Sequence, residues 1–252
     1  MNIQKIINLL NHKYPIETQE DFDQCGLFLE HNNNIDKVLV CLDISIDIVN
    51  FSIKNNINLL ISHHPIFLDN EKYPLNEYNQ KIIDLLKKNS IAILFLHTCF
   101  DKSDEGMNYI LSKKIGLEKI QRLGNSEYLF KGELNNKIPL DAFLLTLPEI
   151  LNINYANYHK YFEKKIIKTI AICGGSGSSF MNETKDKVDL YITCDMKYHN
   201  WLDSFNSNIC ILELNHNIEN IFINKIKEDL KKFNDLKVLT FISEIDIVRK
   251  SL

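Results

Sequence analysis

Arginine is almost missing from this chain. Arg122 and Arg249 are the only two in 252 residues, and the other basic side chains are 27 lysines. A site built from several two-pronged arginine–phosphate contacts is therefore excluded. The 29 basic and 33 acidic residues leave a formal charge of −4. This balance gives no electrostatic reason to expect nucleic acid or an anionic membrane as the main partner.

The chain also lacks paired cysteines and long apolar runs. Its six cysteines are scattered and form no C-x-x-C pair, which argues against a structural zinc knuckle or a disulfide framework and for reduced thiols. No apolar run reaches the roughly 18 residues that a membrane span needs. Residues 1–5 lead into an amphipathic pattern and do not resemble a signal peptide. We expect a soluble cytoplasmic protein without a membrane segment.

Short apolar runs rich in β-branched residues alternate with helical patterns. This alternation is typical of βαβ units with a mostly parallel sheet. The pattern changes near residue 120. The periodicity of apolar residues is weak over 120–165, and the alternation of strand and helix patterns then resumes. We therefore expect an α/β fold of two packed halves, 1–120 and 121–252. The predicted strands are 38–42, 59–62, 91–96, 166–173, 190–193, 209–214 and 238–242, and the predicted helices are 46–55, 78–89, 106–114, 197–206 and 218–233.

His63 and His64 follow the predicted strand 59–62, in the motif Ser-His-His-Pro. The carboxyl ends of parallel strands are where open α/β sheets bind ligands. Because successive side chains of a strand point in opposite directions, the two rings could serve two metals. Taken alone, they could equally be two solvated loop histidines.

His97 and Asp101 follow the next apolar strand, 91–96. Asp101 could bind a metal directly, and His97 could bind one or donate to a ligand. The alternative is that Asp101 caps the helix beginning near Gly106, or the turn before it.

His216 and Glu219 follow a third strand, 209–214. Their spacing of three places them on one face of the first helical turn. Imidazole with carboxylate suits Zn, Fe, Mn or Co. The alternative is that Glu219 only complements the helix dipole.

Without His97, the candidate ligands number five, one more than a closed tetrahedral site uses: His63, His64, Asp101, His216 and Glu219. If one carboxylate bridges, they can hold two metals and leave positions for water, which is the arrangement of two-metal hydrolytic sites.

Weaker candidates lie in other loops. Asp23 reads as part of a turn before Gly26, and Asp43 is equally plausible as a helix cap. Gly174–Gly177 suits an anion-binding nest but has no basic neighbour. Asp195 and His199 could support the site or face a substrate, or could simply begin a surface helix.

The ordered motifs resemble those of the NIF3-like proteins, the GTP cyclohydrolase 1 type 2 homologues, over roughly residues 1–245. Ser62–Pro65 is similar to the family's S-H-H-P, and 97–101 to its H-[ST]-x-x-D. Further matches, in family order, are Gly106-x-Asn108, Gly116-Leu117, Gly174–Gly177, 189–199 and His216-x-x-Glu219.

This resemblance implies a toroidal homohexamer with a dinuclear metal centre in each subunit. Its ligands carry over to His63, His64, Asp101, His216 and Glu219, with Glu219 as the bridge. Two divalent cations (Zn, Fe or Mn) are implied, and the residues do not choose among them.

We expect a metal-dependent hydrolase of the cyclohydrolase or phosphoester type, acting by metal-activated water on a small, nucleotide-like substrate. His97 and His199 are the candidate catalytic proton carriers, because imidazole titrates near neutrality. The competing hypothesis is a non-catalytic metal-binding scaffold or a metal-responsive regulator.

Overall fold

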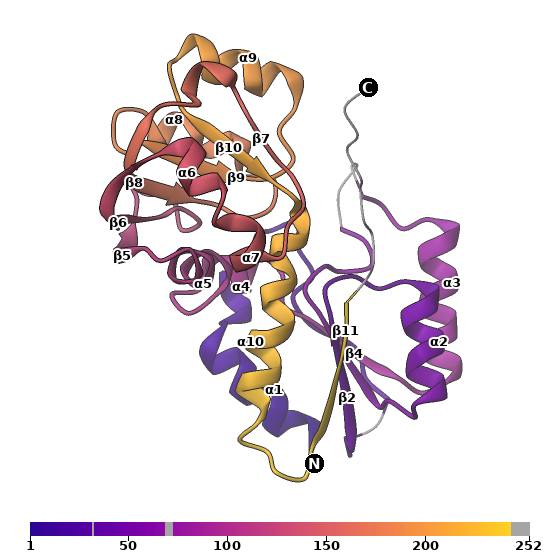
Figure 1. The fold of residues 1–252 in the computed structure, drawn as a ribbon. Coiled ribbons are helices and arrows are strands. Elements are labelled where there is room, and N and C mark those ends of the chain that lie inside the picture. Colours follow the sequence, from indigo (N-terminus) through magenta and orange to yellow (C-terminus); the bar gives the residue numbers. More distant parts are fainter. Residues whose placement is uncertain (32, 69–72, 243–252) are drawn as a thin grey trace. The chain divides into compact units, whose positions relative to one another are not determined.

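The computed structural model describes residues 1–31, 33–68 and 73–242. The chain forms two compact units (Figure 1). Unit 1 comprises Met1–Glu105 and the segment that begins at Asn220, and unit 2 comprises Gly106–Glu219.

Unit 1 contains a five-stranded sheet in the order β1-β4-β3-β2-β11. The pairs β4–β3, β3–β2 and β2–β11 are parallel, and β1 runs antiparallel to β4. The strands are β1 (Gly26–Leu29), β2 (Lys37–Cys41), β3 (Leu59–Ser62), β4 (Ala92–Phe95) and β11 (Lys237–Phe241). The predicted parallel α/β arrangement is therefore present here.

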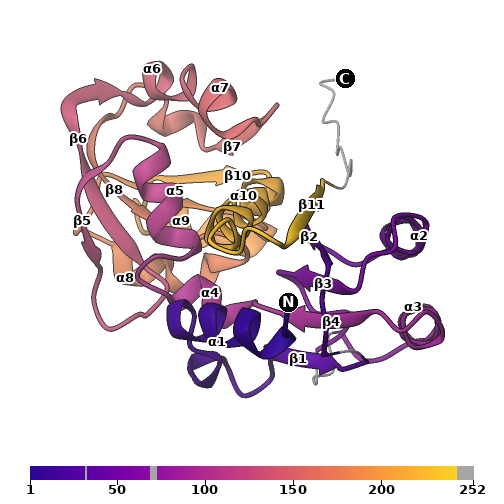
Figure 2. The same ribbon diagram turned by 90° about the horizontal axis from the view of Figure 1, so that it is seen from below.

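Helices cover both faces of this sheet, with α2 and α3 on one side and α1 and α10 on the other (Figure 2). Side chains cap the first turn of three of them. Asn2 accepts a hydrogen bond from the Gln4 amide at α1, Ser45 accepts one from the Ile48 amide at α2, and Asn76 accepts one from the Asn79 amide at α3. The helices of unit 1 are α1 (Ile3–Lys13), α2 (Ile46–Lys54), α3 (Glu77–Lys88), α4 (Thr98–Lys102) and α10 (Ile221–Leu230), with a 3₁₀ turn η1 (Ile16–Thr18).

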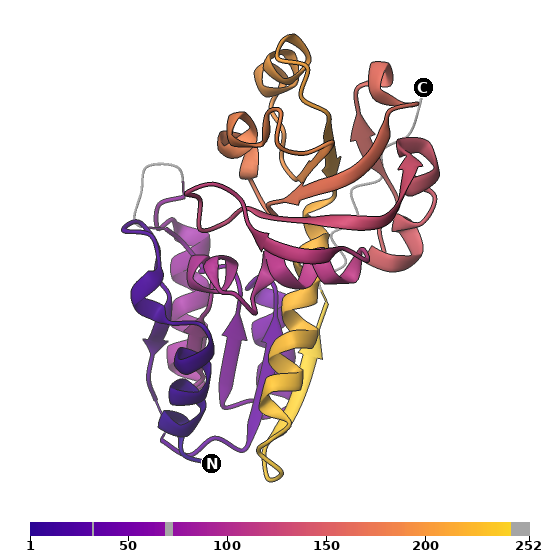
Figure 3. The same ribbon diagram turned by 90° about the vertical axis from the view of Figure 1, so that its left-hand side faces the viewer.

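The chain returns to unit 1 after unit 2, so the division differs from the expected halves 1–120 and 121–252. β11 pairs with β2 over five consecutive residues, from Lys237↔Lys37 to Phe241↔Cys41. Figure 3 shows α10 and β11, in yellow, beside the purple strands of unit 1. Backbone pairing thus assigns the last described elements to the first sheet. Residues 243–252 of the expected second half lie outside the described residues.

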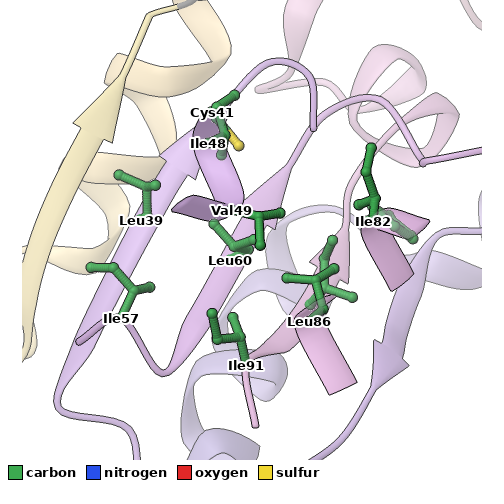
Figure 4. Packing of buried hydrophobic residues seen from close by; sticks show 11 residues of the cluster. Leu39, Cys41, Ile48, Val49, Ile57, Leu60, Ile82, Leu86 and Ile91 are labelled. Carbon is green, nitrogen blue, oxygen red and sulfur yellow. The ribbon is translucent and has the colours of Figure 1, made fainter. Parts of the chain in front are cut away.

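The core of unit 1 lies between its sheet and the pair α2 and α3 (Figure 4). Alternate strand residues such as Leu39, Cys41 and Leu60 face Ile48 and Leu86 from the helices. Burying such apolar surface contributes about 25 cal/mol per Å² and provides the rigid base from which the strand ends project.

Unit 2 contains a six-stranded sheet in the order β5-β6-β8-β9-β10-β7. Only β8–β9 and β9–β10 are parallel, whereas the other three pairs are antiparallel, so this sheet is mixed where a mostly parallel one was expected. The strands are β5 (Glu118–Arg122), β6 (Phe130–Pro139), β7 (Ala156–Tyr158), β8 (Ile166–Ile172), β9 (Leu190–Thr193) and β10 (Ile211–Leu214). The helices and 3₁₀ turns are α5 (Met107–Lys114), α6 (Leu140–Leu144), α7 (Leu147–Leu151), η2 (Lys160–Phe162), η3 (Gly177–Phe180), α8 (Met181–Thr184), α9 (Tyr198–Asn206) and η4 (His216–Asn220).

Among the described residues, none of the helices combines the length and the apolar character that crossing a membrane requires.

Candidate metal centre

His63 and His64 extend from the carboxyl end of β3 in unit 1. Their amides donate to the carbonyls of Cys41 and Leu42, at 3.3 and 2.9 Å, and so continue the ladder with β2. The His63 ring is fully buried, whereas His64 is partly exposed. The ring centroids lie 4.8 Å apart. The two rings are therefore neighbours rather than diverging, because the regular strand ends at Ser62.

His97 joins them from the end of the adjacent strand β4. Its ring centroid lies 5.2 Å from that of His63 and 5.6 Å from that of His64. The three imidazoles offer nitrogen atoms that all lie within 4.8 Å of one another, close enough to share a metal ion. His97 is thus a possible ligand as well as a possible proton carrier.

Asp101 lies in α4, directly beyond His97, with Oδ1 3.5 Å from His63 Nε2. The alternative role as a cap at Gly106 is not observed, since α5 begins there without a side-chain cap. One carboxylate and three imidazoles from two adjacent strand ends therefore converge in unit 1.

The Nδ1 atom of each of these histidines contacts an oxygen acceptor. The acceptors are the Leu96 carbonyl for His63 (2.8 Å), Asp43 for His64 (2.7 Å) and Asp23 for His97 (2.9 Å). Carbonyl and carboxylate oxygens accept hydrogen bonds, so Nδ1 is the donor in each of these contacts and Nε2 is the nitrogen that a cation would bind. Metal-binding histidines are usually oriented by such contacts. By this test the residues of unit 1 fit a divalent cation.

Asp23 was only a weak candidate from the sequence, and the structure gives it a role in the site. Its buried carboxylate accepts hydrogen bonds from His97 Nδ1, from the Thr98 amide at 2.9 Å and from the Thr98 hydroxyl. Burial alone would raise the pKa of Asp23, but the bonds and charge from His97 and Thr98 hold that pKa below its usual value. The side chain therefore stays ionised and orients His97. Nothing in the local sequence, which resembles an ordinary turn, signals this partnership.

Asp43 likewise orients a histidine and caps no helix. Ser45 is the residue that caps α2, and Asp43 contacts His64 instead.

In unit 2, His216 and Glu219 lie side by side in the 3₁₀ turn η4. His216 Nε2 is 2.8 Å from Glu219 Oε2, which confirms the predicted shared face. The turn differs from the expected α-helix beginning at 218. Asn215 stabilises this turn, since its carbonyl accepts a hydrogen bond from the Ile218 amide and its side chain accepts one from the Asn217 amide. Residues three apart eclipse one another in a 3₁₀ turn.

Two carboxylates surround the His216 ring. Asp195 Oδ2 accepts from Nδ1 at 2.6 Å, on the side opposite Glu219. The charge of Glu219 raises the pKa of His216 to about 11, against the opposing effect of burial and with the help of Asp195. In this state a proton occupies Nε2, the atom that would bind a cation. The buried Glu219, imidazole and orienting carboxylate fit a divalent cation as well.

Gly175 allows Glu219 to approach the loop after β8. Its φ is +63°, and a Cβ placed there would lie 2.8 Å from Glu219 Oε1. Two neighbouring amides bond within the protein: Gly174 donates to Asn108, and Gly177 to Thr193. The predicted anion nest is therefore partly occupied by internal hydrogen bonds, and the loop instead makes room for a carboxylate.

His199 lies in the first turn of α9, where it is exposed, with its ring 5.5 Å from that of Tyr198. Its suggested role in proton transfer stays a prediction.

Known proteins resemble this chain over its whole length. The family model for Duf34/NIF3 (NGG1p interacting factor 3) matches residues 1–247. A GTP cyclohydrolase 1 type 2 homolog of Ureaplasma parvum is 36% identical over 251 residues, covering 97% of this chain and 96% of its own. NIF3-like protein 1 of Drosophila melanogaster is 26% identical over 96% of this chain and 86% of its own. The crystal structure of a hypothetical protein from Staphylococcus aureus superposes with a TM-score of 0.87 at 24% identity, covering 100% and 99% of the two chains.

Proposed function

Since the chain belongs to the Duf34/NIF3 family, we propose that it is a metal-dependent hydrolase whose centre is formed by His63, His64, Asp101, His216 and Glu219. One observation supports this most strongly. Every histidine in that set has its Nδ1 on an oxygen acceptor, so its Nε2 is the atom presented to a cation.

The two units supply different parts of this proposed ligand set. Unit 1 contributes two imidazoles and Asp101, and unit 2 contributes His216 and Glu219.

Divalent cations, when bound, would supply Lewis-acid activation of water and polarisation of the bond to be broken. The chain's own side chains would do the rest. Glu219 supplies a negative charge beside His216, and Asp195 and Asp43 keep their imidazoles in one orientation. His97, oriented by Asp23, and His199 would carry protons to and from the reacting groups.

The substrate class is proposed from the relatives. The Ureaplasma parvum protein is named a GTP cyclohydrolase 1 type 2 homolog. We therefore propose a small, nucleotide-like substrate for this chain, cleaved by water.

The decisive experiment compares metal content, thermal stability and activity in three proteins. Wild type, Glu219→Gln and the control Glu133→Gln would be loaded with Zn²⁺, Fe²⁺ or Mn²⁺ and assayed against a panel of nucleotides and phosphoesters. Glu133 is a suitable control because it lies in the same unit but only pairs with Lys119 and Lys168 at the surface. We expect wild type and the control to turn over a substrate, and Glu219→Gln to lose both a metal and the activity.

Full metal loading without turnover of any substrate would contradict the hydrolase proposal. If chelation then also lowered the melting temperature strongly, the metal-binding scaffold would be the better description.

We further propose that the protein acts in the cytoplasm as a toroidal homohexamer. None of the six cysteines forms a disulfide in the part of the chain that the structure describes, which suits a reducing compartment. Light scattering of the purified protein should give six times the 29.4 kDa mass of one chain.

A further inference from the structure

Glu213 is an acidic side chain inside a buried strand. It lies in β10 between Leu212 and Leu214, and only 6% of its surface is exposed. An ionised carboxylate in such surroundings costs several kcal/mol unless hydrogen bonds compensate it. An apolar residue would satisfy the strand pattern at no such cost, so the carboxylate calls for a specific explanation.

Two hydrogen bonds fix the Glu213 carboxylate. Oε2 accepts from Asn157 Nδ2 at 2.5 Å, across the antiparallel pair of β10 with β7. Oε1 accepts from the backbone amide of Met196 at 2.7 Å. The carboxylate therefore ties the edge strand β7 and the loop after β9 to β10.

Met196 directly follows Asp195, the residue that orients His216. Asp195 has φ of +52°, in the left-handed region, which aspartate adopts more readily than most non-glycine residues. The hydrogen bond from the Met196 amide to Glu213 anchors the peptide group that directly follows Asp195. Asp195 Oδ2 is then 2.6 Å from His216 Nδ1.

We propose that Glu213 is a positioning residue for the His216 part of the metal centre. Glu213 holds the loop of Asp195 in place through the Met196 amide, and Asp195 in turn orients the His216 imidazole beside Glu219. Glu213 itself binds no metal in this arrangement. The inference rests on the proposed metal site, and it adds a chain of polar contacts from Asn157 through Glu213 and Asp195 to His216 within unit 2.

The test uses Co²⁺, which reports both affinity and ligand geometry through its visible absorption. Glu213→Ala should weaken Co²⁺ binding at the His216 part of the site about 10-fold, the usual size of such effects on metal affinity. It should also alter the visible spectrum of the bound Co²⁺. Glu213→Gln should restore both, because its amide oxygen can accept from Met196 and a rotated Asn157 amide can accept from its NH₂ group.

A matched control separates positioning from general destabilisation. Asp189 also accepts buried or half-buried hydrogen bonds in unit 2, from the amides of Lys168 and Thr169, but at the opposite end of β9. Asp189→Ala should lower the melting temperature as Glu213→Ala does, while leaving the Co²⁺ spectrum unchanged.

The outcomes distinguish this inference from the proposed function. If His216→Ala binds Co²⁺ as wild type does, the proposed metal site itself is wrong. If His216→Ala loses a metal but folded Glu213→Ala keeps wild-type affinity and spectrum, only the positioning role is wrong. The positioning role would also be wrong if Glu213→Gln, although folded, failed to restore the spectrum.

Discussion

His216 shows most clearly how neighbouring residues change the chemistry of a side chain. Glu219 and Asp195 flank its ring, and the charge of Glu219 raises the pKa of His216 to about 11. This pairing stabilises the metal-free fold fully below the unfolded pKa of 6.5 and is lost as the pH rises through about 11. At neutral pH a cation must therefore displace a proton from this ring.

Metal binding at neutral pH should thus release a proton that comes from His216. Isothermal titration in buffers of different ionisation enthalpy measures the number released. We expect His216→Ala to release about one proton fewer per chain than wild type. Equal release by the two proteins would show that His216 is not the residue displaced.

Asp23 should contribute stability that disappears in acid. Its folded pKa is depressed, so its contribution is present above the unfolded value of 3.8 and is lost as the pH falls towards the folded pKa. Asp23→Asn should cost about 2 kcal/mol in the free energy of unfolding at pH 7. This difference should shrink below pH 3.8.

Urea unfolding at pH 7 and in acid checks the prediction, with Asp36→Asn as the control. Asp36 is an exposed carboxylate of the same unit. A stability difference for Asp23→Asn that persists unchanged in acid would contradict the proposed cause.

At the scale of elements, the loop between β8 and η3 determines where Glu219 can lie. Gly175→Ala introduces a Cβ 2.8 Å from Glu219 Oε1, at a φ of +63°. Gly116 offers a matched control, because its φ is +82° but nothing lies within 4 Å of the added Cβ. Both alanine variants should lose about 1 kcal/mol of stability from backbone strain.

Only Gly175→Ala should also lose metal affinity, since only there does the new methyl displace a ligand. Thermal melts measure the strain, and metal titration measures the displacement. Equal metal affinity in the two variants would show that Glu219 tolerates the methyl group or is not a ligand.

Most central strands were predictable, and so was the edge strand β11, whereas the other edge strands were not. Four central strands are apolar runs because helices or loops cover them: β2, β3, β8 and β9. Their bounds agree with the strands predicted from the sequence. The unpredicted strands β1, β5 and β7 lie at sheet edges, where they are mostly half-exposed or exposed and carry a weak apolar signal. β6 does alternate buried and half-buried positions over Phe130–Leu134, a period-two pattern that could have been found.

At the scale of the whole molecule, the described chain leaves unit 1 and returns to it. The continuous stretch 106–219 contains every strand of the second sheet. The stretch 1–120, by contrast, lacks β11 and α10, which cover one edge and part of one face of the first sheet. Exposed strand edges and apolar faces favour aggregation.

A fragment of residues 106–219 should therefore fold by itself, whereas 1–120 should aggregate unless residues 220–252 are co-expressed with it. Circular dichroism and amide NMR spectra measure the outcome. A folded, monomeric 1–120 fragment would contradict the division into units described above.

By itself, the sequence determined the alternation of strands and helices, the family, and five candidate ligands at three strand ends, because the pattern of apolar residues and side-chain chemistry are local properties. Only the tertiary structure decided which carboxylate faces which histidine. Asp23 is 74 residues from His97, and Asp43 and Asp195 are each 21 residues from their partners. Hydrogen bonds over such separations depend on how strands are ordered in a sheet. The pairing of β11 with β2 likewise joins residues about 200 positions apart, which no local sequence pattern specifies.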